Sequence, residues 1–262
     1  MPGTGRGWPG LVRCGARGAA TLGHVELRDA WERHAAEWVR WAREPGHDSY
    51  WLFHRDRFLE LVSPPGRLTI DLGCGEGRLA RDLKALGHRV VAVDSSPSMV
   101  EAARAADPEL EVVEADAAML PFEDCAADLI VAFMSLHDID DMSGGVREAA
   151  RVLEPGGRLV AAVVHPINTG GKFESRDPDA AFVIRDSYFD RRRYTDAIVR
   201  DGLGMTFESR HWTLEDYVTA MADADLMVDA LREIAEPDHA RWARLPLFLH
   251  FRAVRGKASQ PG

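Results

Sequence analysis

The stretch LTIDLGCGEGRLARDL, from Leu68 to Leu83, places a glycine-rich turn between a short apolar run and a helical pattern. A run of this length is typical of a strand buried in a parallel sheet, and the apolar spacing after Gly77 is typical of an amphipathic helix. Ligands of open α/β sheets bind at the carboxyl ends of the strands. The turn from Asp71 to Gly77 is therefore the first candidate for a ligand site.

The glycines of this turn, Gly73, Gly75 and Gly77, follow the spacing G-x-G-x-G, with Asp71 two residues before the first. The dinucleotide fingerprint is longer, G-x-G-x-x-G, and its loop brings a helix N-terminus against a pyrophosphate. A carboxylate at Asp71 would repel a pyrophosphate and attract an ammonium or sulfonium group. The turn thus favours a cationic ligand, and an NAD-dependent dehydrogenase is the weaker alternative. Helix–strand packing is an equally good explanation for Gly77.

Strand-like runs alternate with helical patterns along most of the chain, which predicts right-handed βαβ units and an α/β fold. We expect a Rossmann-like, seven-stranded, mostly parallel sheet flanked by helices. The expected strands lie within residues 67–73, 88–94, 110–116, 127–134, 158–165, 227–234 and 247–256.

The chain of 262 residues is expected to form a single domain over residues 25–262, after a disordered leader over residues 1–24. A polar segment interrupts the alternation after the fifth strand and is predicted to lie over the strand ends as a lid. The parts of the domain are N-terminal cap helices (25–66), a cofactor-binding core (67–165), the lid insertion (166–211), and a C-terminal helix with closing strands (212–256).

Composition excludes several classes of function. The formal net charge of −10 argues against nucleic acid as the main partner, and no apolar run is long enough to span a membrane. The three cysteines, Cys14, Cys74 and Cys125, lack the spacing of a metal site and suit free thiols in a reducing cytoplasm. We expect no metal, and a monomer or homodimer that acts on a small molecule.

Four segments in order resemble the successive motifs of class I S-adenosylmethionine-dependent methyltransferases, especially the UbiE-like small-molecule group. The segments are IDLGCGEGRLA, VVAVDSSPSMVEAAR, VEADAAMLPFEDCAADLIVAFMSLHDI and REAARVLEPGGRLV, and the likeness covers about residues 68–165. The resemblance implies the class I methyltransferase fold and S-adenosylmethionine as cofactor, with S-adenosylhomocysteine as product.

Acidic residues at the strand ends suit parts of such a cofactor. Asp94 would accept hydrogen bonds from ribose hydroxyls, and Asp116 from an adenine amino group. The resemblance adds the glycine loop for the methionine portion, neighbours of each strand end, and Tyr50 on a helix that caps the cofactor in the family. The expected cofactor-binding residues are Tyr50, Asp71, Gly73, Cys74, Gly75, Asp94, Ser95, Met99, Asp116, Ala117, Met134 and Ser135.

Methyl transfer from a sulfonium is an in-line displacement, in which positioning and exclusion of water can supply most of the rate. A general base is needed only when the acceptor carries a proton. His137 and His165 follow the fourth and fifth expected strands, and are the candidate catalytic residues because an imidazole suits a base. A capping or loop role is an equally good explanation for His137. The expected substrate-binding residues are His54, Asn168, Phe173, Tyr188 and His211.

The sequence therefore predicts a methyltransferase that uses S-adenosylmethionine on a small organic molecule, by O- or N-methylation of a bacterial secondary metabolite. C-methylation, a cyclase or pericyclic catalyst that retains the cofactor on the same fold, and a non-catalytic sensor domain are the alternatives. The cofactor motifs do not separate these, because all of them need the same pocket.

Overall fold

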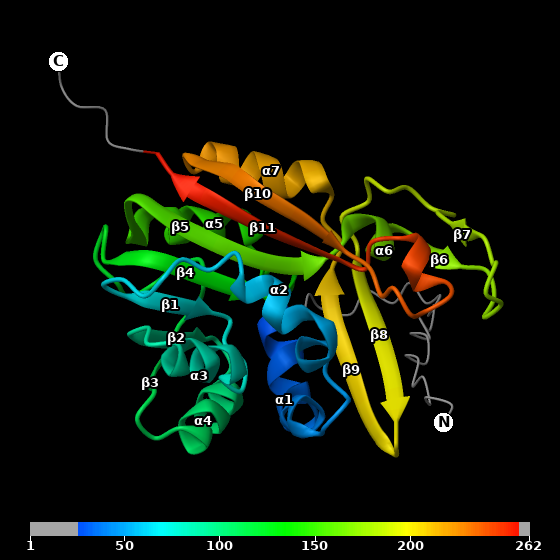
Figure 1. Cartoon of the computed structure of the whole chain (residues 1–262), viewed down its shortest axis with the longest axis horizontal. Helices are drawn as coiled ribbons and strands as arrows, with labels where there is room; N and C mark the ends of the chain where they lie inside the picture. Colours follow the sequence, from blue (N-terminus) through cyan, green and yellow to red (C-terminus); the bar gives the residue numbers. More distant parts are fainter. Residues whose placement is uncertain (1–25, 257–262) are drawn as a thin grey trace.

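The computed structural model describes residues 26–256, so the expected leader at residues 1–24 lies outside the described residues. A seven-stranded sheet crosses the molecule in the order β10-β11-β5-β4-β1-β2-β3 (Figure 1). Only β11 runs antiparallel to its neighbours in this sheet, which confirms the predicted fold. The strands are β1 (Thr69–Leu72), β2 (Val90–Asp94), β3 (Glu111–Glu114), β4 (Ala127–Phe133), β5 (Leu153–Val164), β10 (Leu226–Ile234) and β11 (Phe248–Arg255).

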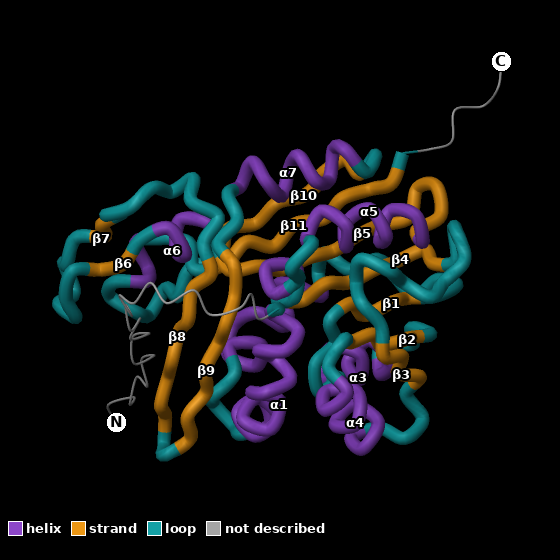
Figure 2. The backbone as a smooth tube through the Cα atoms, turned by 180° about the vertical axis from the view of Figure 1, so that it is seen from behind, coloured by secondary structure: helices purple, strands orange, loops and turns teal. Residues whose placement is uncertain are grey.

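The central strands are apolar on both faces because helices cover both sides of the sheet. In β4, Ile130 and Ala132 belong to one hydrophobic cluster, whereas Leu129, Val131 and Phe133 belong to another. The first cluster includes side chains of α5 (Met142–Val152) and α7 (Leu214–Asp223). The second includes side chains of α2 (Arg55–Leu59), α3 (Arg78–Ala85) and α4 (Pro97–Ala106). Figures 1 and 2 show the two groups of helices on opposite sides of the sheet.

Two helices begin with the capping residues that the sequence indicates. Ser96 precedes α4 and its hydroxyl accepts the Met99 N–H, with Pro97 at the first helical position. Thr213 and Asp216 form a capping box at the start of α7. These contacts satisfy N–H groups that the first turn of a helix leaves free, so the sequence fixes both helix starts locally.

The segment from 166 to 211 folds into more regular structure than the sequence predicts. After α6 (Pro166–Gly170) come a short hairpin of β6 (Lys172–Phe173) and β7 (Phe182–Val183), then a longer hairpin of β8 (Arg193–Arg200) and β9 (Leu203–Arg210). The longer hairpin lies along α1 (Leu27–Arg43), as Figure 1 shows, with Phe207 of β9 against Trp31 and Trp38 of α1.

Three short helical turns complete the description. They are η1 (Tyr50–His54), η2 (Leu136–Asp138) and η3 (Trp242–Arg244). Within residues 26–256, no helix is both long and apolar enough to cross a membrane.

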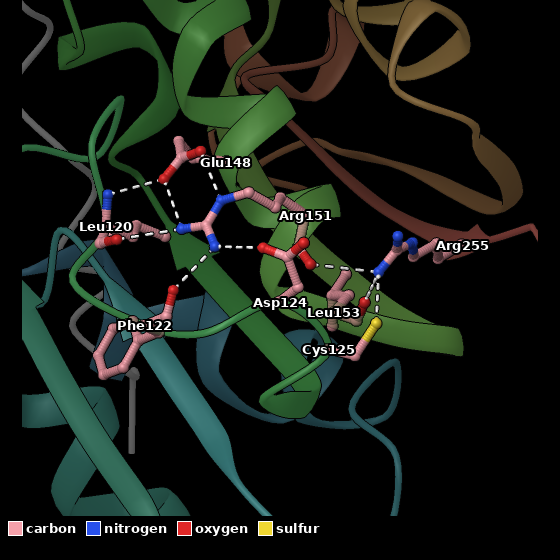
Figure 3. A network of polar contacts seen from close by, with 8 residues as sticks. All are labelled: Leu120, Phe122, Asp124, Cys125, Glu148, Arg151, Leu153 and Arg255. Atoms are coloured by element: carbon pink, nitrogen blue, oxygen red, sulfur yellow. Dashed lines mark hydrogen bonds and ion pairs between the residues drawn. The ribbon is translucent and has the colours of Figure 1, made fainter.

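Arg151 of α5 fixes the loop between β3 and β4 (Figure 3). Its guanidinium donates to the carbonyl oxygens of Leu120 and Phe122 at 3.1 and 2.8 Å, and to the Asp124 carboxylate at 2.8 Å. Glu148 pairs with Arg151 and also accepts the Leu120 N–H at 2.9 Å. The start of this loop lies at the carboxyl edge of the sheet, so the network holds one side of that edge in place.

Candidate active site

A cavity of about 380 Å³ lies at the carboxyl ends of β1, β2 and β4, where a doubly covered sheet is expected to bind its ligand. The loop after β1 lines this cavity with Gly73, Cys74 and Gly75. Helix α1 and the β8–β9 hairpin also contribute lining side chains.

The glycine loop after β1 brings its backbone close to two neighbours. Gly73 has a φ of 72°, and a Cβ there would overlap the side chain of Ser135. Gly75 has a φ of 55°, and a Cβ there would meet Trp38 Nε1 at 3.1 Å. Gly77 does not line the cavity and faces Ala103 of α4 instead. Gly73 and Gly75 therefore allow the close backbone approach at the cavity, and Gly77 allows close packing of the loop against α4.

Asp71, at the end of β1, is the feature that best fits a cationic ligand. Its side chain is buried and lines the cavity, and its carboxyl oxygen Oδ2 has no hydrogen-bond partner within residues 26–256. Burial raises the pKa of Asp71 to about 7, although Arg78 opposes the shift. A buried carboxyl with a free oxygen is unfavourable unless a donor or cation completes it. The ammonium and sulfonium groups of S-adenosylmethionine fit that requirement.

Asp94 and Asp116 line the same cavity from the next two strand ends. The Asp94 carboxylate accepts the N–H groups of Gly75 and Ser96 at 2.8 and 2.9 Å, which fixes its orientation. Burial nevertheless raises the pKa of Asp94. Asp116 is exposed and accepts the Ala118 N–H at 2.8 Å. This arrangement suits a ribose beside Asp94 and an adenine at the more open rim beside Asp116.

His137 and Asp138 follow β4 in η2 and also line the cavity. Burial lowers the pKa of His137 to about 3, so its imidazole is neutral, and its Nδ1 has no hydrogen-bond partner. Its Nε2 lies 3.7 Å from Asp138 Oδ1. Burial raises the pKa of the Asp138 carboxyl well above its usual range, while hydrogen bonds from the Ser209 and Trp31 side chains oppose the shift. These two groups can receive protons or hydrogen bonds from a ligand.

The structure brings the predicted cofactor-binding residues together at this cavity, with one exception. Tyr50 does not line it. The Tyr50 side chain is buried, its hydroxyl donates to Asp82 at 2.6 Å, and its ring packs edge-on against Phe133. The residues at the cavity are Asp71, Gly73, Cys74, Gly75, Asp94, Ser95, Met99, Asp116, Ala117, Met134 and Ser135.

Among the other predicted residues, His137 and Asn168 line the cavity and His165 and His54 do not. His165 caps α6, because its Nδ1 accepts the Ile167 N–H at 3.1 Å, and its Nε2 lies 3.1 Å from Glu233. Both of its nitrogens are therefore engaged away from the cavity. His54 is fully buried, and its Nδ1 lies 2.8 Å from Nε2 of a second histidine, His250.

The remaining predicted substrate residues, Phe173, Tyr188 and His211, also lie outside the cavity. Phe173 packs against Trp242, with ring centroids 4.8 Å apart. The Tyr188 hydroxyl accepts the Leu214 N–H, and His211 donates from Nε2 to the Tyr188 carbonyl at 2.6 Å. Phe173 therefore packs on the segment after β10, whereas Tyr188 and His211 contact each other within the insertion.

Sequence reasoning missed the walls contributed by α1 and the β8–β9 hairpin. Trp31 and Trp38 of α1 line the cavity, and their helical spacing was the available signal. Tyr194 and Asp196 of β8 line it from alternate positions, and so do Phe207 and Ser209 of β9. This spacing of two is typical of strands and marks one face of the hairpin.

Arg78, in the first turn of α3, was also left without a role. Its guanidinium pairs with Asp48 at 2.6 Å, and both side chains are buried. The guanidinium carbon also lies 4.7 Å from the centroid of the Trp38 ring. Arg78 is thus committed to protein partners beside the glycine loop of the cavity.

Comparison with known proteins agrees with this geometry. Residues 70–161 match the family described as a methyltransferase domain. A demethylmenaquinone methyltransferase of Clavibacter sepedonicus is 37% identical over 118 residues, which are 44% of this chain and 47% of that protein. The chain therefore spans about half the length of this curated relative.

Solved structures share the fold over most of the chain. An S-adenosylmethionine-dependent methyltransferase from Mesorhizobium loti aligns with a TM-score of 0.65 at 23% identity, covering 76% of this chain and 96% of that one. The [4+2]-cyclase SpnF aligns with a TM-score of 0.61 at 17% identity, covering 88% and 96%. Residues 70–161 are therefore similar to a methyltransferase domain, and the chain has the class I S-adenosylmethionine-dependent methyltransferase fold.

Proposed function

We propose that the protein is a methyltransferase that uses S-adenosylmethionine to methylate oxygen or nitrogen of a small organic molecule, in bacterial secondary metabolism. The observation that carries this proposal is the buried, incompletely bonded Asp71 carboxyl in a cavity at the carboxyl edge of the sheet. The same proposal puts the enzyme in the cytoplasm, which the free thiols of Cys74 and Cys125 support.

The cofactor supplies an activated methyl group on a sulfonium. In the proposed arrangement Asp71 and the loop of Gly73 and Gly75 hold the methionine end, and the fixed carboxylate of Asp94 accepts the ribose hydroxyls. Asp116 and Ala117 contact the adenine at the rim. These contacts orient the reacting methyl group toward the acceptor side of the cavity.

The acceptor side is bounded by His137, Asn168 and the hairpin residue Phe207. An imidazole with a pKa of about 3 is a weak base at neutral pH, so His137 orients the acceptor through Nδ1 rather than removing its proton. We therefore attribute most of the rate to positioning and to exclusion of water. No proton transfer by His165 is needed, which agrees with its contacts outside the cavity.

A non-methylating enzyme on the same fold is the second candidate, because the fold is shared with a [4+2]-cyclase. Cofactor binding alone does not distinguish the two. The mass of the product does, since methylation adds one carbon and cyclisation adds none.

Two measurements test the proposal. Calorimetry should show binding of S-adenosylmethionine and no binding of NAD, and failure to bind S-adenosylmethionine would end the proposal. The protein is then incubated with methyl-labelled S-adenosylmethionine and a bacterial small-molecule extract. We expect label in a small molecule together with S-adenosylhomocysteine, and a product that forms without label would instead support the cyclase.

His137→Ala and His165→Ala provide a matched pair in the same assay. His137→Ala should lower turnover and keep cofactor affinity, since only His137 lines the cavity. His165→Ala should lower stability by about 1 kcal/mol through loss of the α6 cap, with turnover kept. Equal effects on turnover would contradict the assignment of His137 to the acceptor side.

A further inference from the structure

We propose that the methyl acceptor is a basic amine, whose nitrogen is held between Asp138, His137 and the aromatic wall of Trp31, Trp38 and Phe207. This inference rests on the proposed methyltransferase function, and it selects nitrogen among the possible acceptor atoms. It follows from the charge of the cavity, from free acceptor atoms at its inner end, and from the aromatic rings beside them.

The cavity is strongly acidic. Among the residues that the structure describes, nine aspartate and glutamate side chains line it, against two arginines. Arg78 is already paired with Asp48, and Arg28 is exposed at the start of α1. A carboxylate or phosphate acceptor would therefore meet repulsion in this cavity, whereas a protonated amine would be attracted.

Asp138 and His137 offer acceptor atoms that the described residues leave open. Asp138 Oδ1 and His137 Nδ1 both lack a hydrogen-bond partner, and His137 is only 4% exposed. The neighbouring carboxylate of Asp140 is occupied, since it pairs with Arg193 at 2.5 Å. Two open acceptors on adjacent residues require a ligand that donates hydrogen bonds, and an ammonium or amine donates two or three.

The aromatic wall suits the same ligand. Trp31, Trp38 and Phe207 line the cavity with ring centroids 5.9 to 6.3 Å apart, each pair edge to face. Aromatic faces attract cations, and the Arg78 guanidinium already lies 4.7 Å from the Trp38 ring. A carboxyl group beside such rings therefore favours the binding of an organic cation.

The reaction balances without an added base or oxidant. The Asp138 carboxylate takes one proton from the ammonium through Oδ1, which the described residues leave without a hydrogen-bond partner. The freed nitrogen lone pair forms a bond to the methyl carbon as the carbon–sulfur bond breaks. The positive charge passes from sulfur to nitrogen, which leaves a methylated ammonium beside the aromatic wall and a neutral thioether.

An alcohol or phenol fits less well. A neutral hydroxyl carries no positive charge, so it gains nothing from the acidic lining or from the aromatic faces that attract an ammonium. The same groups therefore favour nitrogen over oxygen.

The test compares three probes with one carbon skeleton: phenethylamine, 2-phenylethanol and phenylacetate. Each is titrated into the full protein saturated with S-adenosylhomocysteine, at pH 7, by calorimetry. We expect phenethylamine to bind about tenfold or more tighter than 2-phenylethanol, and phenylacetate to bind weakest. If phenylacetate binds as tightly as phenethylamine, or if no probe binds, the amine inference is overturned.

Asp138→Asn tests the named carboxyl, with Asp56→Asn as a control at a side chain that is 86% exposed. Asp138→Asn should abolish the preference for phenethylamine over 2-phenylethanol and keep the S-adenosylhomocysteine affinity, which also shows that the variant folds. An unchanged preference would overturn the role of Asp138. Failure of the wild-type protein to bind S-adenosylhomocysteine would instead overturn the proposed function, so the two failures are distinguishable.

Discussion

Asp71→Asn should make the cofactor-free protein more stable and the cofactor weaker in binding. The Asp71 carboxyl is buried with one oxygen unpartnered within the described residues, so Arg78 compensates its charge only in part until another cation binds. An asparagine keeps the shape and removes the charge. A gain in stability together with a loss of cofactor affinity distinguishes a ligand-binding aspartate from an ordinary structural one.

The magnitude follows from the pKa of Asp71, which burial raises from 3.8 to about 7. Because the folded value lies above the unfolded one, ionisation of Asp71 opposes folding. The penalty is absent below about pH 4, grows as pH rises between the two values, and is complete above pH 7. The difference between the two pKa values lowers the free energy of unfolding by at most about 4 kcal/mol at pH 8 and by less than about 1 kcal/mol at pH 4. Loss of a charged hydrogen bond to the ammonium should weaken cofactor binding by about 1.5–3 kcal/mol.

Urea unfolding of the cofactor-free protein at pH 8 and pH 4 measures the first effect, and calorimetry with S-adenosylmethionine at pH 8 measures the second. Asp107→Asn is the matched control, because Lys84 pairs with Asp107 at 2.8 Å and lowers its pKa. That variant should lose stability at pH 8 and keep cofactor affinity. If Asp71→Asn lowers stability at pH 8, or leaves the affinity unchanged, the assignment of Asp71 to the cationic end is refuted.

Three further results are expected. Gly73→Ala should lower stability by about 1–3 kcal/mol and weaken cofactor binding, since the φ of Gly73, 72°, is left-handed. If urea unfolding and calorimetry show neither effect, the close approach of the Gly73 backbone to Ser135 is contradicted. Burial lowers the pKa of His250 to about 3, so protons bind preferentially to the unfolded chain below pH 6.5. His250 alone should therefore reduce the free energy of unfolding by about 2 kcal/mol between pH 7 and pH 5. A free energy of unfolding that does not change with pH in this range would argue against the neutral pair of His250 with His54. Arg151→Gln should cost about 1–3 kcal/mol and loosen the loop that begins at Asp116, seen as faster amide exchange there, whereas the exposed Arg147→Gln should do neither.

The sheet could be predicted because its signals are local. Each central strand is a short apolar run, and both faces are buried, so the run alone identifies it. Gly73 follows β1 directly, and Asp94 is the last residue of β2. The strand ends of one parallel sheet share an edge, so Asp71, Asp94 and Asp116 had to lie near one another. The cofactor side of the cavity followed from these two facts.

The errors fall where a residue's partner is far away in the sequence. His54 stands on an amphipathic pattern next to the predicted cap, yet it pairs with His250, 196 residues later. Tyr50 has a partner in Asp82 of α3, which removes it from the cavity. Nothing in the local pattern around either residue indicates those contacts.

The acceptor side depends on such distant contacts throughout. The Leu27 N–H of α1 donates to Asp140 after β4 at 2.6 Å, and Arg193 of β8 pairs with the same carboxylate. Arg33 of α1 pairs in turn with Glu208 of β9 at 3.2 Å. One carboxylate and one ion pair thus join three segments into a single wall. In the proposed function, acceptor choice therefore depends on how α1, η2 and the hairpin pack together.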